Sequence, residues 1–191
     1  ARIDLKPFST AVIKQILADH HPDYTPEDLL MCYAITGGVA KYVAQLMDEG
    51  CKTWEDMLHA VCRPSSIFLE EGTELLVGEF GRKYQIYYSI LQLIARGKTN
   101  QAEIDSIIGK NTGRYLDTLE TEYSLISKRR PMWAKPNSQG VKFYIEDCFL
   151  MFWFRFVEAN RSVVELGKLG LLLEIIKQDY PQFSGMVLEK Y

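Results

Sequence analysis

The apolar positions in residues 1–80 repeat every three or four residues, which is the spacing of one face of an amphipathic helix. Such repeats are Val12, Ile13, Ile16 and Leu17; Leu29, Leu30, Tyr33 and Ala34; and Val39, Tyr42, Val43 and Leu46. Residues 2–8, which come before them, form a short strand-like segment. The pattern predicts a small helical bundle over residues 1–80, in which each repeat is the buried face of one helix.

Helix-start signals precede several of these repeats. Thr25 stands before a proline at the first helical position, and Thr53 opens a Thr-Trp-Glu-Asp sequence that is similar to a capping box. Ser9 or Thr10 can cap the first helix. Thr25 and Thr53 are therefore predicted to be N-caps.

Glycines mark the ends and the weak points of this bundle. The pair Gly37 and Gly38 would break one helix and let the next begin close by. Ser65 or Ser66 can cap a further helix, which is predicted to run through Phe80, and Gly72 and Gly78 make its continuity uncertain.

Residues 84–147 contain three short helical repeats followed by two strand-like runs. The predicted inward positions are Tyr84, Tyr87, Tyr88, Leu91, Ile94 and Ala95; Ile104, Ile107 and Ile108; and Leu116, Leu119 and Tyr123. Gly97 and Gly109 would end the first two helices, and Thr99 or Asn100 would cap the second. Leu125 and Ile126 lead into the first strand, residues 128–140 are predicted as a loop, and residues 141–145 alternate as the returning strand. This order is typical of a winged helix-turn-helix.

Aromatic side chains follow the second strand at helical spacing. They are Phe149, Phe152, Trp153 and Phe156, which favour a core helix over a ligand-stacking surface. A last apolar helix is predicted over residues 163–177, with Pro181 after it and another element beginning at residue 183. The predicted fold class is mainly α: a helical bundle over residues 1–80, a winged helix-turn-helix with a small β-hairpin wing over 81–147, and C-terminal helices over 148–191.

The charge is distributed unevenly along the chain. The formal net charge is −3 in total, but residues 82–146 hold eleven Lys or Arg and six acids, a local balance of +5 that leaves −8 for the rest. A total of −3 argues against a protein that coats nucleic acid along its whole surface. The basic middle segment still allows a local nucleic-acid contact.

Other classes of chemistry find little support in the composition. The four cysteines are widely spaced, with no CxxC pair and no nearby His, and so are predicted to be buried free thiols of a reducing, cytoplasmic compartment rather than zinc ligands. The longest apolar run, residues 148–154, is too short to span a membrane. No Ser-His-acid or Cys-His arrangement is present, so no catalytic residue and no metal ligand is expected in this chain.

Several ordered motifs resemble a known family. They are Leu5-Lys6-Pro7-Phe8, Ile35-Thr36-Gly37-Gly38-Val39-Ala40-Lys41-Tyr42, Tyr144-Ile145-Glu146-Asp147, Phe152-Trp153-Phe154-Arg155-Phe156, and Phe183-Ser184-Gly185 with Glu189. The set is similar to the C-terminal part of the prokaryotic AAA+ (STAND-like) ATPases often called the archaeal ATPase family. The resemblance implies a lid, a winged helix and the start of a C-terminal domain of unknown function. It also implies that the chain is a fragment of a longer protein whose upstream P-loop domain binds ATP and Mg.

The chain itself has no G-x-x-x-x-G-K-[ST] motif, so ATP hydrolysis is not expected from these residues. In the family a proline and an arginine follow Gly-Gly-x, where this chain has Ala40 and Lys41. Lys41 is thus the residue that the resemblance suggests as a nucleotide sensor, although an ammonium lacks the fork of a guanidinium.

DNA binding by a winged helix requires polar residues on the third helix and cations in the wing. The candidates for contact with double-stranded DNA are Asn111, Thr112 and Arg114 on the helix, and Lys128, Arg129, Arg130, Lys135 and Lys142 around the wing. Asp117, Glu120 and Glu122 on the same helix oppose this function, because carboxylates repel phosphates. The alternative is a protein-docking or regulatory module that couples the ATPase to a partner or to a nuclease-like domain.

Overall fold

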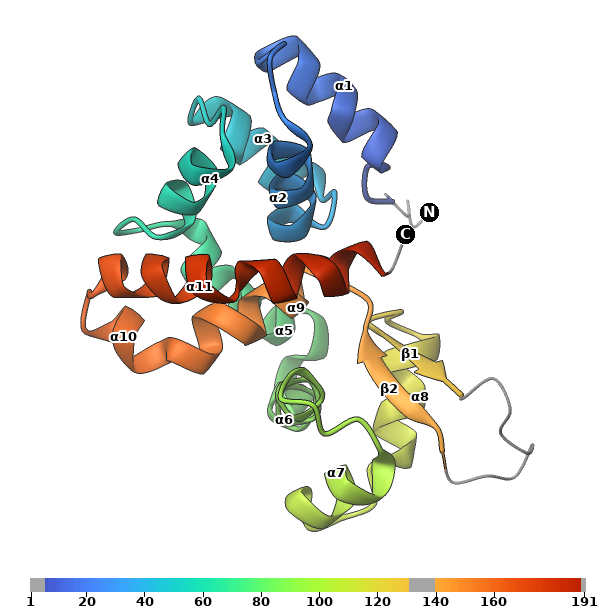
Figure 1. Cartoon of the computed structure of the whole chain (residues 1–191). Helices are drawn as coiled ribbons and strands as arrows, with labels where there is room; N and C mark the ends of the chain where they lie inside the picture. The colour runs from blue at the N-terminus through green and yellow to red at the C-terminus, as the bar shows by residue number, and fades with distance from the viewer. Residues whose placement is uncertain (1–5, 131–139, 190–191) are drawn as a thin grey trace. The chain divides into compact units, whose positions relative to one another are not determined.

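The computed structural model describes residues 6–130 and 140–189, which are mainly helical, with one two-stranded antiparallel hairpin (Figure 1). Contacts divide the chain into two compact units. Unit 1 comprises Ala1–Glu70 and Phe156–Tyr191, and unit 2 comprises Glu71–Arg155. The predicted class, mainly α with a β-hairpin wing, is confirmed. The two units meet in the chain after Glu70 and after Arg155, whereas the domain boundaries predicted from the sequence follow residues 80 and 147.

Unit 1 is a bundle of helices from both ends of the chain. Its helices are α1 (Thr10–His20), α2 (Pro26–Thr36), α3 (Ala40–Asp48), α4 (Trp54–Val61), the beginning of α5 (Ile67–Phe80), the short 3₁₀ turn Glu158–Asn160, α10 (Arg161–Glu165) and α11 (Leu169–Leu188). Helix α2 contacts α1, α3, α4 and α11, so it is the helix on which the bundle packs. No helix among the described residues combines the length and the apolar character needed to cross a bilayer.

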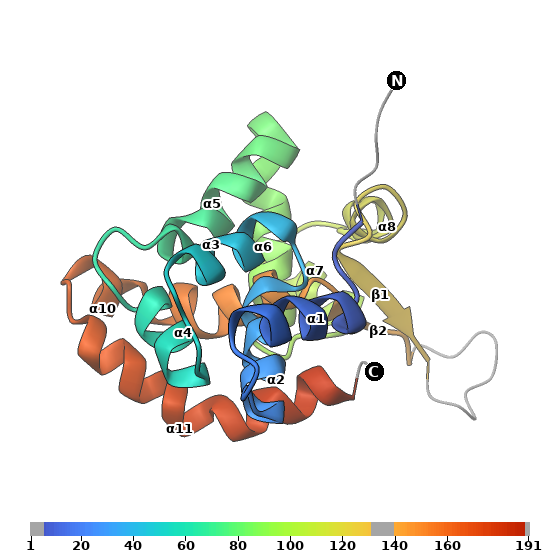
Figure 2. The same ribbon diagram turned by 90° about the horizontal axis from the view of Figure 1, so that it is seen from above.

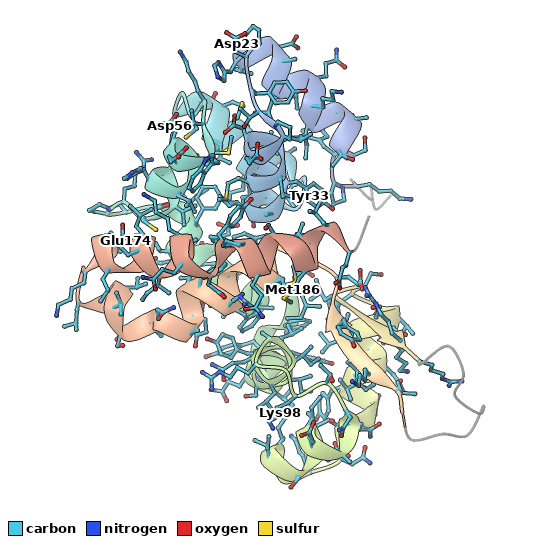
Figure 3. All side chains as sticks on the ribbon, viewed as in Figure 1. Asp23, Tyr33, Asp56, Lys98, Glu174 and Met186 are labelled. Carbon is cyan, nitrogen blue, oxygen red and sulfur yellow. The ribbon has the colours of Figure 1, made fainter. Side chains whose placement is uncertain are left out.

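The N-termini of α2 and α4 are joined by one buried carboxylate. Thr25 and Thr53 each form the predicted capping box, with Asp28 and Asp56 as the reciprocal acids; Asp56 is labelled in Figure 3. Asp28 is only 2% exposed and accepts hydrogen bonds from the Thr25 N–H at 2.7 Å and from the Trp54 N–H at 2.6 Å. A buried carboxylate is tolerated when backbone donors satisfy it. Asp28 therefore fixes the start of α4 against α2.

The predicted inner face of α2 is partly wrong. Leu29, Leu30 and Tyr33 are only half-buried. The fully buried residues are Met31, Cys32, Ala34, Ile35 and Thr36, with Asp28. Because α2 has helices on several sides, its buried surface is wider than a single amphipathic stripe. In α1 the buried face is instead narrower than predicted: Ile13 and Leu17 are buried, but Val12 is 40% exposed.

The glycine pair separates α2 from α3 as predicted. Gly37 ends α2 with φ 58°, and Gly38 has φ 78°. The Phe8 N–H donates to the Gly38 carbonyl at 2.7 Å, and a Cβ on Gly38 would lie far closer to the Phe8 carbonyl oxygen than side chains tolerate. Close backbone contact therefore requires glycine at this position. The strand-like segment predicted over residues 2–8 lies mostly outside the described residues.

Unit 2 contains the winged helix-turn-helix. After the end of α5 and a 3₁₀ turn (Gly81–Lys83) come α6 (Tyr84–Ala95), α7 (Gln101–Ile108), α8 (Gly113–Thr121), β1 (Ile126–Arg129), β2 (Lys142–Ile145) and α9 (Cys148–Phe152) (Figure 1). Helix α6 contacts α7, α8 and β2, and α8 contacts β1. The Phe143 N–H also donates to the Thr99 carbonyl at 2.7 Å, so the connection between α6 and α7 pairs with the hairpin.

Helix ends in unit 2 follow local chemistry. Asn100 caps α7 through the Glu103 N–H, and Gly109 ends it in the left-handed conformation. The predicted inward face is correct for Ile104, which is fully buried, and wrong for Ile107, which is 55% exposed. Ile107 instead lines an open surface of this two-turn helix, together with Ala102 and Ser106.

The C-terminal segments differ from the prediction in three ways. The four aromatic residues are buried as expected, but regular helix ends at Phe152 and continues as a π turn, Trp153–Val157. Gly167, with φ 66°, splits the predicted helix over residues 163–177 into α10 and α11. Pro181 lies inside α11, which is drawn as one helix in Figure 2, because the buried Ile176, Phe183 and Val187 hold both sides of the proline in the bundle.

Candidate nucleic-acid interface

The register of the hairpin sorts its side chains onto two faces. It pairs Ile126 with Ile145, Ser127 with Tyr144, Lys128 with Phe143, and Arg129 with Lys142. Paired residues share a face, and neighbours along a strand alternate. Lys128 therefore lies on the face of the buried Phe143, whereas Arg129 and Lys142 lie on the opposite face. Two of the cations predicted to be in the loop, Lys128 and Arg129, are in fact in β1, because the strand extends three residues beyond Ile126.

The outer face of the hairpin collects positive charge at its distal end. The Arg129 guanidinium lies 4.9 Å from the centre of the Tyr144 ring and 3.0 Å from a Glu146 carboxylate oxygen. Lys142 is exposed and stands directly across from Arg129. Arg130, also exposed, follows in the chain. Two cations facing each other across strands repel, so this pairing costs stability unless an anion lies between them.

The inner face gives Lys128 a different environment. Its ammonium lies 2.6 Å from an Asp117 oxygen and 2.8 Å from a Glu120 oxygen, both on α8, and 5.9 Å from the centre of the Phe143 ring. The hydrogen bond to Asp117, followed by that to Glu120, raises the pKa of Lys128. Lys128 thus bridges the hairpin and α8.

Two of the three predicted helix candidates are exposed. Arg114 lies in the first turn of α8, and no ion pair is found for it among the described residues. Asn111 is also exposed and its side-chain oxygen accepts from the Gly113 N–H at 3.0 Å. These two side chains are at the N-terminal end of α8, where a winged helix presents its recognition residues.

The prediction that Thr112 contacts DNA is contradicted. Thr112 is fully buried, and its N–H and its hydroxyl each donate to the same Asp105 oxygen at 2.6 Å. Asp105 precedes α8 in the chain by one helical turn and a loop, so Thr112 turns inward to satisfy it. The hydroxyl hydrogen bond from Thr112, together with that from its N–H, lowers the pKa of Asp105.

Replacing Thr112 with valine is expected to lower the free energy of unfolding by about 1 kcal/mol at pH 7, because Asp105 loses a charge-assisted hydrogen bond. A lowered pKa stabilises the fold above the unfolded value of about 3.9, and that contribution is lost as pH falls through the folded value. The difference between Thr112→Val and wild type in urea unfolding should therefore shrink below about pH 4. A difference independent of pH would contradict the Asp105 contact.

Aromatic rings hold α8 in unit 2. The Tyr87 ring of α6 lies 5.5 Å from Tyr115 and 6.1 Å from Tyr123, and it stacks on Phe80 at 4.3 Å. Lys110 lies over the Tyr115 ring at 5.1 Å. Sequence reasoning did not choose Lys110, although its place directly after the helix-ending Gly109 puts it beside the start of α8. Ring contacts of this kind, made with the buried Phe80 and Tyr87, fix the direction of the helix that carries Arg114.

The two remaining candidates are Lys135 and Lys41, and Lys135 lies outside the described residues. Lys98, which was not a candidate and is labelled in Figure 3, is at the turn between α6 and α7 and pairs with Glu103 at 3.4 Å. Lys41 is exposed in the first turn of α3, and its ammonium lies 5.7 Å from the centre of the Tyr42 ring. Nothing in this geometry assigns Lys41 a ligand.

The cysteines are buried free thiols, as predicted. Burial raises the pKa of Cys32 to about 12, of Cys51 to about 11 and of Cys62 to about 12. Thiols of such high pKa are poor nucleophiles and poor metal ligands at neutral pH. Within residues 6–130 and 140–189, no three His, Cys, Asp or Glu side chains are grouped to hold a metal ion.

Unit 1 has an apolar groove of about 360 Å³. It is lined by Thr10, Pro26, Glu27, Leu29, Leu30, Tyr33 and Leu188; Tyr33 is labelled in Figure 3. The groove explains why part of the predicted inner face of α2 is only half-buried: those side chains line an open surface.

Comparisons with known proteins find one distant relative. The chain is 29% identical over 185 residues to "Uncharacterized protein MJECL04" of Methanocaldococcus jannaschii, an alignment that covers 93% of this chain and 40% of that protein. The chain therefore spans less than half the length of this archaeal relative. No model of a known protein family matches the chain, and no solved structure gives a significant match.

Proposed function

We propose that unit 2 binds double-stranded DNA, with α8 in the major groove and the hairpin against the phosphate backbone. The observation that carries this proposal is the like-charged pair Arg129 and Lys142 at the distal end of the hairpin, with Arg130 beside it. A protein gains nothing in stability from such a pair. Phosphates between or beside the two side chains would turn the repulsion into a favourable contact.

The residues divide between two tasks. Arg114 is long enough to reach a guanine edge from the first turn of α8, and Asn111 lies beside it. Arg129, Arg130 and Lys142 bind phosphates, as does Lys135, which lies outside the described residues. The Arg129 guanidinium already forms an ion pair with Glu146, so its contribution to phosphate binding is smaller than that of Lys142.

A protein-docking or regulatory role is the second candidate. It is favoured by the acids on α8, since the Asp117 side chain is 63% exposed and Glu122 is exposed as well. Acids on the groove-facing helix weaken binding to a polyanion, whereas a basic surface on a partner protein would tolerate them.

Titration with a mixed-sequence duplex at low and moderate salt separates the two candidates. If the cations bind phosphates, affinity should fall steeply with salt, with a slope of log K against log [salt] of about −0.9 per phosphate contacted. Fluorescence anisotropy of a labelled duplex measures this slope. Absence of binding even at low salt would contradict the DNA proposal and favour docking.

We further propose that the chain acts as the non-catalytic C-terminal part of an AAA+ ATPase, with unit 1 in the place of the lid and Lys41 as the nucleotide sensor. The motif resemblance supports this, and the relative's greater length is compatible with it. ATP and Mg would then bind to a P-loop domain preceding this chain. The sequence encoded upstream tests the assignment: a P-loop there supports it, and an unrelated domain contradicts it.

A further inference from the structure

Lys128 is the only one of the described candidate cations that lies between two carboxylates. Asp117 and Glu120 are three residues apart on α8, so their side chains project from the same side of the helix. The Lys128 ammonium lies within 2.6 Å of the first and 2.8 Å of the second. Its side chain is 34% exposed, compared with 27% for Glu120 and 63% for Asp117.

The strand register makes this arrangement obligatory. Because Lys128 is paired with the buried Phe143, it must face α8, while its neighbour Arg129 must face away. Lys128 also lies near the Phe143 ring. The side chain is therefore held by a helix, by a strand partner and by two charged hydrogen bonds, which is unlike the situation of an exposed wing cation.

The contact changes the charge that α8 would present to DNA. Without Lys128, Asp117 and Glu120 would place two uncompensated negative charges on the helix proposed to enter the groove. With Lys128 between them, one of those charges is cancelled and both carboxylates are paired with a side chain of the hairpin. Like charges brought together at an interface lower affinity strongly, so this compensation matters for binding.

We propose that Lys128 is a positioning residue of the DNA interface and not a phosphate ligand: it cancels one of the two negative charges of Asp117 and Glu120 and ties the hairpin to α8. Because it concerns the DNA-facing helix, this role rests on the proposed function. It also reduces the objection that the acids of α8 raise against DNA binding, since Lys128 supplies one counter-charge to the pair Asp117 and Glu120.

A phosphate ligand and a positioning residue differ in how the effect of replacing Lys128 combines with the effect of replacing the two acids. If Lys128 is a phosphate ligand, its substitution weakens duplex binding by the same factor whether or not Asp117 and Glu120 are charged. If Lys128 compensates the acids, its substitution weakens duplex binding only while those acids are charged, because their negative charges are then left uncompensated. The experiment therefore compares Lys128→Met in the wild-type chain with Lys128→Met in an Asp117→Asn/Glu120→Gln background.

The matched control is Lys142→Met in the same two backgrounds. Lys142 carries the same charge and stands on the opposite face of the hairpin. By duplex anisotropy, Lys128→Met should weaken binding about tenfold in the wild-type chain and less than about threefold in the neutralised background. Lys142→Met should weaken duplex binding by the same factor in both backgrounds.

A second readout requires no DNA. In urea unfolding, Lys128→Met should lower the midpoint in the wild-type chain but not in the neutralised background, whereas Lys142→Met should show no such dependence. If the wild-type chain binds no duplex, the proposed function fails, and the unfolding data still show whether Lys128 pairs with the acids. If duplex binds and Lys128→Met costs the same factor in both backgrounds, the positioning role is overturned while DNA binding stands.

Discussion

Replacing Gly72 with alanine is expected to destabilise unit 2 by about 3 kcal/mol. A Cβ at this position of α5 would lie well under 3.0 Å from atoms of the Trp153 indole, a distance that real Cβ atoms essentially never show. The indole cannot swing aside easily, because it is 2% exposed and packs edge-on against Phe154 at 5.1 Å and Tyr88 at 6.3 Å. Helix α5 must therefore move away from the ring, at the cost of buried contacts. Urea unfolding followed by circular dichroism measures the loss.

Gly78 in the same helix is the matched control. A Cβ there meets nothing within 4 Å, so Gly78→Ala should raise stability by about 0.5–1 kcal/mol through the better helix propensity of alanine. In a Trp153→Leu background, the cost of Gly72→Ala should fall below about 1 kcal/mol, because the obstructing ring is gone. Equal effects of Gly72→Ala and Gly78→Ala would show that α5 and the indole do not pack as described.

The variant Arg114→Ala/Arg130→Ala/Lys142→Ala is expected to bind duplex DNA roughly 100-fold more weakly than the wild-type chain at moderate salt. Arg114 would lose a base-edge contact, and the other two would lose phosphate contacts. The salt slope should become shallower by about 2, one for each phosphate ligand removed. Because these three side chains are exposed and no ion pair is found for them in the described part of the chain, the substitutions should not lower the unfolding midpoint.

A charge-matched control uses exposed lysines of unit 1. Lys14→Ala/Lys52→Ala/Lys168→Ala removes the same number of positive charges from surfaces outside the proposed interface. If net charge alone governs binding, both triple variants should lose affinity equally. A loss confined to the unit 2 variant supports the interface, and an equal loss in both would contradict it.

Local chemistry was sufficient to predict where most helices begin and end. Thr25 and Thr53 form capping boxes, and Gly97 and Gly109 end helices, because each of these residues acts on backbone groups within four positions of itself. The order of three short helices and a hairpin was readable for the same reason. Alternation and helical spacing are local properties, and they defined the mainly helical fold with its wing.

Which side of each helix is buried depended on its neighbours. Helix α2 buries a wider surface than its own pattern indicates because helices contact it on several sides, and α7 leaves Ile107 exposed because it has few contacts. Pro181 ends no helix, since buried residues on both sides of it outweigh the lost hydrogen bond. Propensity is a weak term beside burial in such cases.

The candidate interface was identified by sequence at the level of segments but not of individual roles. The basic wing and the start of the third helix were evident from charge and order alone. That Thr112 turns inward to Asp105, that Lys128 joins Asp117 and Glu120, and that Arg129 shares a face with Lys142 all depend on strand register and on which helix packs against the hairpin. A shift of one residue in register would exchange the two faces, so only the tertiary structure could decide which cations are left for a phosphate.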